Sequence, residues 1–426
     1  MRCPARGTIR AIVGTTATTT KGPEEEGRYR WVIVLVLAAI TNVGYGTIFY
    51  SFSILLGEGA AADEFGRALL SGALGLGVVV SGVLAPIVGT LCDITGSRRV
   101  FFAGAVLGSA GLAAFSRTTE GWQVLAAWAL LIGPAMACTF YEPAYVTIDQ
   151  WFAGRSTGTA IGVLTLVGGL SATIFIPLTQ SLVDSMGWRD ATLLLAAVLL
   201  AVVGALALVF LRDQPREEAR QETLDLKGAY GALGTGLRHT NRAFWLVSTS
   251  YFLGFVAVFA VLFHQVAYLQ ELGLTTGTAA FAAGLVGLVG LPGRLFFPIL
   301  GDRVRPSFLI ATIFLMVALS VIFLPGAEER WQLYLYVGLF GLSFGAVLPM
   351  RAIIMGHHFG GPHYGRLMGL QFALLGLATA GGPVGAGVLR DASGSYALLP
   401  PAVIVMLLLA IPAILVAERE GRTEPT

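Results

Sequence analysis

Three ionisable side chains lie deep inside long apolar runs of this 426-residue chain: Glu142, Arg294 and Arg351. Glu142 lies ten residues before Phe152, and Arg351 and Arg294 lie eight residues before Phe359 and Asp302. At a helical rise of 1.5 Å per residue, these spacings place the charges ~12–15 Å from the turns that follow. A charge at the centre of a bilayer costs about 2.5–3.5 kcal/mol, so these side chains are expected to pair and to serve a function. The alternative is that Arg294 and Arg351 extend their stems towards the lipid headgroups.

Polar and aromatic residues in the same runs are weaker candidates for contact with a ligand. Tyr141 adjoins Glu142, and Asn42 and Tyr45 fall in the middle of the first run. Their hydroxyl and amide groups can bind a solute, although such residues more often join one helix to another.

The composition is that of an integral membrane protein. Hydrophobic residues make up 55% of the chain and charged residues only 12%, whereas a soluble protein carries about 25% charged residues. The net charge of +2 gives no reason to expect a nucleic-acid partner. The three cysteines form neither a disulfide framework nor a metal-ligand spacing.

Apolar runs long enough to cross a bilayer recur along the chain and predict an all-α fold of twelve transmembrane helices. The expected order is a disordered tail (1–30), a six-helix bundle (31–212), a central loop (213–243), a second six-helix bundle (244–417) and a short tail (418–426). The runs are 31–56, 67–92, 99–116, 122–149, 157–182, 188–212, 244–269, 276–301, 307–325, 331–356, 366–390 and 395–417.

The distribution of arginine and lysine predicts the orientation of the chain. With both termini in the cytoplasm, the tails, the central loop and most short inner loops are basic, as the positive-inside rule requires. The residues left on the outer side are Arg67, Arg117, Arg189, Arg330 and Arg390. A plasma-membrane protein with cytoplasmic termini is therefore expected.

The two halves of the chain repeat one another. A shift of 207 residues superimposes a turn and a whole helix of one half on those of the other, which predicts two bundles related by a parallel repeat with a site between them. The matching pairs are Phe152 and Phe359, Gly154 and Gly361, Gly158 and Gly365, Gly162 and Gly369, Gly169 and Gly376, and Leu170 and Leu377.

The loop after the second run, GTLCDITGSRRV, resembles the G-x-L-x-D-x-x-G-x-R signature of the major facilitator superfamily. The equivalent loop after the eighth run, PILGDRVRPS, keeps Asp302 and Arg303 but lacks the expected glycine. The segment WFAGR…PLTQSLVDSMGWRDA is similar to bacterial members near the monocarboxylate and oxalate/formate porter branch. The residues that match the first signature are Gly89, Leu91, Asp93, Gly96 and Arg98.

The resemblance implies roles for two sets of residues. The aspartate and arginine of each signature loop would hold the halves together at the cytoplasmic face, although Ile94 replaces a basic residue of the family pattern. Helices 4 and 10 would face one another across a cavity that helix 1 also lines. We therefore expect Glu142 and Arg351 to form a gate pair that is closed in the outward-facing state. Either Arg294 then binds an anion or Glu142 carries a proton.

The resemblance does not identify a substrate. In the monocarboxylate branch an arginine of helix 8 binds the carboxylate, with an aspartate four residues earlier. Arg294 occupies the arginine position, but Gly290 stands in place of the aspartate. The oxalate/formate porters add a lysine on helix 11, which this chain lacks.

The predicted function is secondary active transport of a small, monocarboxylate-like organic anion by alternating access. Transport is expected to be coupled to protons. Two buried arginines against one carboxylate favour an anion. Proton-driven efflux of a drug or metabolite is the alternative, and a receptor that resembles a transporter is an alternative of another class. We expect no enzymatic activity, no cofactor and a monomer in the lipid bilayer. No metal site is expected either, because His357, His358 and His363 fall in what reads as a mobile turn.

Overall fold

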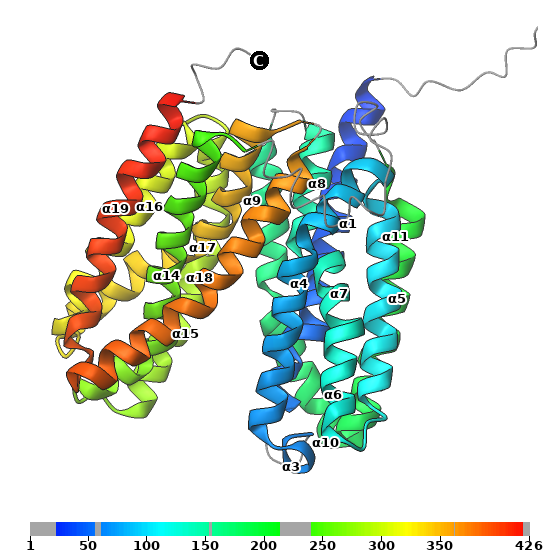
Figure 1. The fold of residues 1–426 in the computed structure, drawn as a ribbon, viewed down its shortest axis with the longest axis horizontal. Helices are drawn as coiled ribbons and strands as arrows, with labels where there is room; N and C mark the ends of the chain where they lie inside the picture. The colour runs from blue at the N-terminus through cyan, green and yellow to red at the C-terminus, as the bar shows by residue number, and fades with distance from the viewer. Residues whose placement is uncertain (1–22, 56–60, 153–155, 214–239, 362, 421–426) are drawn as a thin grey trace, which may run out of the picture.

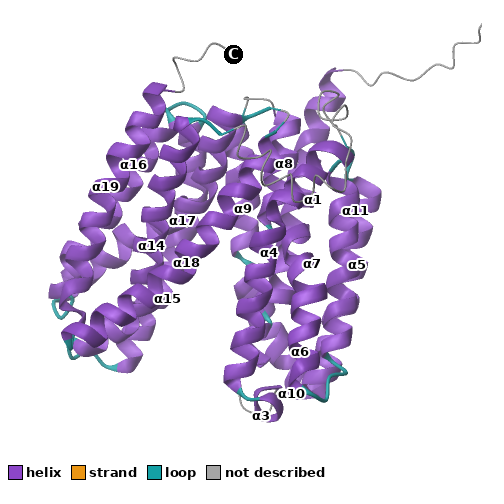
Figure 2. Cartoon of the chain, in the orientation of Figure 1, coloured by secondary structure: helices purple, strands orange, loops and turns teal. Residues whose placement is uncertain are grey.

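The computed structural model describes residues 23–55, 61–152, 156–213, 240–361 and 363–420. Within these ranges every regular element is a helix (Figure 2). The expected tail at 1–22 and most of the expected central loop lie outside the described residues. Helix α1 begins at Pro23, inside the segment expected to be a disordered tail, and helix α19 continues to Glu420, inside the expected second tail.

Six membrane crossings build the N-terminal bundle, and several of them contain a π-helical turn or a break. The first crossing is α1 (Pro23–Gly44), η1 (Tyr45–Tyr50) and α2 (Phe52–Leu55), followed by the short α3 (Ala61–Phe65), and the next two are α4 (Arg67–Thr95) and α5 (Ser97–Phe115). The fourth is α6 (Gly121–Ala127), η2 (Trp128–Ile132), α7 (Gly133–Thr139) and α8 (Tyr141–Phe152). The last two are formed by α9 (Thr157–Gly169), α10 (Ser171–Val198), η3 (Leu199–Gly204) and α11 (Ala205–Phe210).

Six longer and more regular crossings build the C-terminal bundle. They are α14 (Arg242–Glu271), α15 (Thr276–Gly301), α16 (Pro306–Phe323) with η4 (Leu324–Gly326), α17 (Arg330–Phe359), α18 (Tyr364–Ser393), and η5 (Tyr396–Leu398) with α19 (Leu399–Glu420).

The described residues contain 11 continuous helical segments long and apolar enough to span a membrane. One of them, Thr157–Phe210, is 54 residues long, about twice what one crossing needs. Gly187 interrupts it with a φ of +79°, a conformation that glycine adopts without steric cost. The interruption divides this segment into two crossings, so the predicted twelve-helix fold is confirmed.

Large apolar side chains cover the outside of both bundles. Leu130 is 71% exposed, and Leu377 and Phe263 are 68% and 64% exposed. A soluble protein does not display so many such residues together, whereas lipid tails are a favourable solvent for them. The outer surface of the helices therefore fits contact with lipid.

The two bundles lean together at one end and separate at the other (Figure 1). The converging end carries the start of α1 and the end of α19. Two helix pairs make most of the contact between the bundles, α4 with α18 and α9 with α15. Both pairs cross from one half of the chain to the other.

Glycines allow the backbones of these pairs to touch. A Cβ atom at Gly158 would lie 2.0 Å from the Pro298 carbonyl oxygen, and one at Gly365 would lie 2.4 Å from the Gly89 carbonyl oxygen. Gly158 and Gly365 are partners in the 207-residue repeat. Each half thus presents the same small-residue helix to the other, as expected for close packing in lipid.

The packing inside the C-terminal bundle gives a stability prediction. A Cβ atom at Gly293 would lie 2.1 Å from the Leu342 carbonyl oxygen of α17, whereas nothing lies within 4 Å of one at Gly284 on the same helix. Gly293→Ala should therefore destabilise the fold by about 1–3 kcal/mol. The thermal unfolding temperature in detergent should fall for Gly293→Ala and stay constant for Gly284→Ala; equal effects would contradict the close contact.

Candidate functional site

A buried ion pair between Glu142 and Arg351 joins the two bundles. Glu142 belongs to α8 and Arg351 to α17, so the partners come from the fourth and tenth crossings. Arg351 Nη1 lies 2.9 Å from Glu142 Oε1, and Arg351 Nη2 lies 2.9 Å from Glu142 Oε2. The two parallel bonds form the planar fork geometry that makes arginine–carboxylate pairs strong and specific.

Helix α18 accepts two further hydrogen bonds from Arg351. Its Nε donates to Gln371 Oε1 at 2.9 Å, and its Nη2 also donates to the Met368 carbonyl oxygen at 3.1 Å. The guanidinium lies 5.6 Å from the centre of the Phe372 ring. Arg351 has no solvent-exposed surface, so the alternative in which it extends to the headgroups does not apply. This network holds α8, α17 and α18 together.

Arg294, on α15, is in a different electrostatic situation. Its Nη1 donates to the Thr165 carbonyl oxygen of α9 at 3.2 Å, and no carboxylate pairs with it among the described residues. The side chain is half-buried and lies against Gly169, where a Cβ atom would be 3.0 Å from its Nε. Arg294 is therefore an uncompensated positive charge between the bundles.

The aromatic candidates surround these charges. Tyr45 stacks on Phe140 with ring centroids 3.8 Å apart and lies 4.9 Å from the ring of Tyr141. The Tyr141 hydroxyl lies against Gly168, next to the glycine that accommodates Arg294. Tyr145, one turn further along α8, lies within electrostatic reach of all three ionisable side chains. The three charges are thus gathered around one group of tyrosines.

Asn42 serves another purpose. Its Nδ2 donates to the Val167 carbonyl oxygen at 2.7 Å, and its own carbonyl oxygen accepts from Ser171 Oγ at 2.6 Å. It is 7% exposed. These bonds join α1 to the fifth crossing. Asn42 therefore makes a contact between helices, which was the alternative to solute binding.

At the converging end, Asp302 connects the bundles. It follows the last residue of α15 and accepts hydrogen bonds from the first turn of α9: Gly158 N–H to Oδ1 at 2.7 Å, and Thr159 N–H to Oδ2 at 3.0 Å. The Thr159 hydroxyl adds a third bond of 2.6 Å. A carboxylate is favourable here because it caps free N–H groups and faces the positive end of the helix dipole.

Asp93 occupies the corresponding place in the other half. It is buried in the last turn of α4, and a Cβ atom at Gly365, near the start of α18, would lie 2.8 Å from its Oδ2. Gly89 lies one turn earlier on α4, against the Gly365 carbonyl oxygen. Each signature aspartate therefore lies at the N-terminus of a helix from the opposite bundle.

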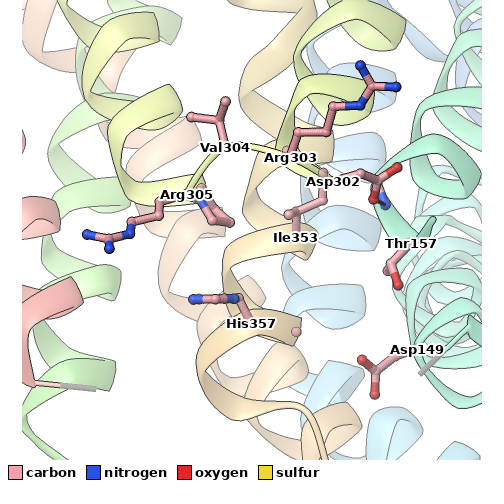
Figure 3. Close-up of a pocket in the computed structure, with 12 residues that line it drawn as sticks. Asp149, Thr157, Asp302, Arg303, Val304, Arg305, Ile353 and His357 are labelled. Atoms are coloured by element: carbon pink, nitrogen blue, oxygen red, sulfur yellow. Dashed lines mark hydrogen bonds between the residues drawn. The ribbon is translucent and has the colours of Figure 1, made fainter. Parts of the chain in front are cut away.

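The arginines of the signature loops do not share this position. The Arg98 guanidinium donates to the Leu208 carbonyl oxygen, and its main-chain N–H donates to Asp213 Oδ1 at 2.9 Å, all within its own bundle. Gly96 has a φ of +85° and lies against Asp213, where a side chain would not fit. Arg303 is exposed and lines a cavity of about 320 Å³ beside Asp302 (Figure 3). In the two signature loops, contact with the opposite bundle is therefore made by the aspartates, Asp93 and Asp302.

Two polar groups of the site are absent from the sequence-based candidates. Gln371 is the one amide in the apolar first half of α18, a signal that the sequence offered. The Thr165 carbonyl oxygen is a main-chain group that close packing of α9 against α15 brings within reach of Arg294, and no side-chain type in the sequence indicates it.

The cap at Asp302 gives a prediction about conformation. Asp302→Ala removes three hydrogen bonds between the bundles and should weaken the converged end by about 0.5–2 kcal/mol, the usual effect of losing a helix cap. The distance between spin labels at exposed Arg99 and Arg305, in a cysteine-free background, is measured by double electron–electron resonance. The variant should show a larger fraction of long distances between the two labels. Asp391→Ala, at the opposite end, is the control; identical distance distributions would contradict the role of the cap.

Similarity to known proteins agrees with this geometry. The chain is 29% identical over 384 residues to monocarboxylate transporter 13 of Rattus norvegicus, covering 87% of this chain and 85% of the relative. It is 28% identical over 392 residues to monocarboxylate transporter 11 of Mus musculus, covering 88% and 84%. An uncharacterized transporter of Bacillus subtilis, YcxA, is 22% identical over 388 residues, covering 89% and 93%.

Solved structures share the fold. The human organic anion transporter MFSD10 superimposes with a TM-score of 0.72 at 17% identity, covering 92% of this chain and 100% of that one. The transporter FucP in its outward conformation gives a TM-score of 0.70 at 17% identity, covering 94% and 100%. The sequence profile described as Major Facilitator Superfamily matches residues 34–383. The protein therefore belongs to the major facilitator superfamily, as a membrane transporter and not an enzyme, and is related to the monocarboxylate transporters.

Proposed function

We propose that this protein transports a small organic anion of the monocarboxylate class together with a proton, by alternating access across the plasma membrane. In this proposal both termini are cytoplasmic, so the converging end of the bundles is the cytoplasmic end. The proposal rests mainly on one observation: Arg294 is a positive charge within the membrane-spanning region that no carboxylate neutralises among the described residues.

An unpaired arginine between the bundles favours a negatively charged ligand. Burying an isolated charge costs several kcal/mol, and a bound carboxylate recovers part of that cost by offering two acceptor oxygens to the guanidinium. Arg351 is less suited to this task while Glu142 occupies its two Nη groups. The site thus has one neutralised arginine and one available arginine, which supports transport of a monoanion.

Glu142 is the group proposed to carry the proton. A proton on its carboxyl group removes the charge that holds Arg351 and so weakens a contact between α8 and α17. Because the two partners belong to different bundles, their separation is coupled to the relative motion of the bundles. Proton uptake and opening of the cytoplasmic side then become linked events, as alternating access requires.

The relatives are consistent with this substrate class. Two of the relatives described above are named monocarboxylate transporters, and one of the structures that share the fold is a human organic anion transporter. Arg294 supplies the cationic group that such substrates need, although Gly290 shows that the helix-8 pattern of the branch is incomplete here.

The anion site is tested by changing Arg294. Arg294→Gln should lower uptake of short-chain carboxylates into proteoliposomes by at least about tenfold, because a hydrogen bond to a charged group contributes about 1.5–3 kcal/mol. Arg294→Lys should retain part of the activity, since it keeps the charge but loses the planar fork. Arg330→Gln, an exposed arginine at the start of α17, is the control. Unchanged carboxylate uptake in Arg294→Gln would refute the anion site.

Proton coupling is tested by changing Glu142. Glu142→Gln cannot bind a proton at this site, so an inward proton gradient should no longer accelerate uptake, while exchange of labelled for unlabelled substrate should persist. The folded fraction is checked by size-exclusion chromatography, because an unpaired Arg351 destabilises the protein by about 3–5 kcal/mol. Glu328→Gln, an exposed acid in the loop before α17, is the control. Retention of the normal pH dependence would remove Glu142 from the coupling mechanism.

A further inference from the structure

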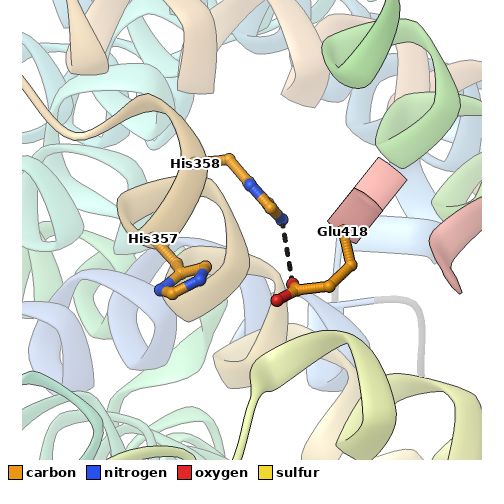
Figure 4. Close-up of side chains that lie close together, drawn as sticks. All are labelled: His357, His358 and Glu418. Atoms are coloured by element: carbon orange, nitrogen blue, oxygen red, sulfur yellow. Dashed lines mark ion pairs between the residues drawn. The ribbon is translucent and has the colours of Figure 1, made fainter. Parts of the chain in front are cut away.

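Two histidines and a glutamate meet at the converging end of the C-terminal bundle. His357 and His358 form the last turn of α17, so they lie in a helix and not in the turn that the sequence suggested. Glu418 reaches them from the last turns of α19 (Figure 4). One ligating atom from each of the three residues lies within 4.8 Å of those from the other two.

The distance between His358 and Glu418 does not suit a hydrogen bond. His358 Nε2 lies 3.5 Å from Glu418 Oε2, and this nitrogen is buried without any hydrogen-bond partner among the described residues. The side chains are only 6% and 8% exposed. A buried polar atom without a partner is costly, so its persistence calls for an explanation.

A metal ion between the two atoms supplies that explanation. Tetrahedral Zn²⁺ with ligands at about 2.0–2.1 Å separates neighbouring ligand atoms by ~3.4 Å, close to the separation found here. The ligand atoms lie within 4.8 Å of one another, so His357 must move by up to about 1.4 Å to reach that separation, and its side chain is exposed. We propose that His357, His358 and Glu418 bind a divalent transition-metal ion, with Zn²⁺ as the best fit. Two imidazoles with one carboxylate favour such an ion over Mg²⁺ or Ca²⁺.

A third helix supports the proposed ligands. Ser307, in the first turn of α16, donates its hydroxyl to Glu418 Oε2 at 2.8 Å. Metal-binding carboxylates are commonly oriented by a hydrogen bond of this kind. The buried serine thereby fixes the carboxylate in the direction of His358.

An entry path for the ion is present. His357 lines the cavity of about 320 Å³ that also contains Asp149 and Asp302 (Figure 3). Arg303 and Arg305 also line this cavity and balance its two carboxylates, so the cavity gives the ion access without attracting it by net charge. His357 belongs both to the cavity lining and to the ligand cluster. The bound ion would fasten the end of α17, the helix that carries Arg351, to the end of α19.

The experiment measures Zn²⁺ binding to the full chain in detergent, purified without a histidine tag and freed of metal by chelation. Isothermal titration calorimetry should show one saturable site for Zn²⁺ and none of similar affinity for Mg²⁺. His358→Phe, which fills the same space, and Glu418→Gln, which keeps the acceptor for Ser307, should each weaken binding by at least about 100-fold. Ser307→Ala should weaken it by about tenfold, as expected for a supporting hydrogen bond. His363→Ala, outside the cluster, is the matched control.

A second readout needs no variant. Co²⁺ added to the wild-type protein should produce the visible absorption of a four-coordinate ion, and excess Zn²⁺ should abolish it. Absence of saturable Zn²⁺ binding would overturn the proposal, as would binding that His358→Phe and Glu418→Gln leave intact. In either case His358 and Glu418 would be an ordinary long ion pair. Because these measurements do not involve uptake, their outcome is independent of the proposed transport activity.

Discussion

The cost of placing a charge in lipid governs the centre of this protein. Arg351 has no exposed surface, and Glu142 offers it two hydrogen bonds of 2.9 Å from the opposite bundle. Removal of one partner from such a pair leaves an uncompensated charge, so the two helices remain together while both groups are ionised. Protonation is the simplest event that changes this condition, which makes the pair suitable for coupling a proton to the movement of the bundles.

The cytoplasmic contacts proposed here follow the symmetry of the chain. Asp302 caps α9, and Asp93 lies beside Gly365 at the start of α18. Both contacts place a single carboxylate, exposed at Asp302 and buried at Asp93, at a helix N-terminus instead of against an arginine. Such contacts can be broken and reformed at modest cost, whereas the Glu142–Arg351 pair needs a chemical change. In the proposed mechanism, the aspartate contacts close the cytoplasmic end and the Glu142–Arg351 pair responds to the proton.

Glycine makes both kinds of contact possible. The backbone of α9 approaches that of α15 so closely that Gly158 has no room for a side chain and Gly162 has little. The same approach places the Thr165 carbonyl oxygen within reach of Arg294. In lipid, close packing replaces the hydrophobic effect as the force between helices. The glycines of α9 therefore shape the proposed anion site as well as the scaffold.

Much of this architecture could be predicted from the sequence. The number of crossings follows from the length of the apolar runs, the two-bundle arrangement from the 207-residue repeat, and the pairing of Glu142 with Arg351 from their similar depth, because these properties depend on local composition and on the cost of charge in lipid. Tertiary structure decided the rest. Arg98 hydrogen-bonds within its own bundle, and Asn42 joins two helices. Glu418 lies beside two histidines some sixty residues away in sequence. Those outcomes depend on how each helix is rotated about its axis and packed against its neighbours. No local sequence pattern reveals that rotation, because it is set by contacts between distant segments.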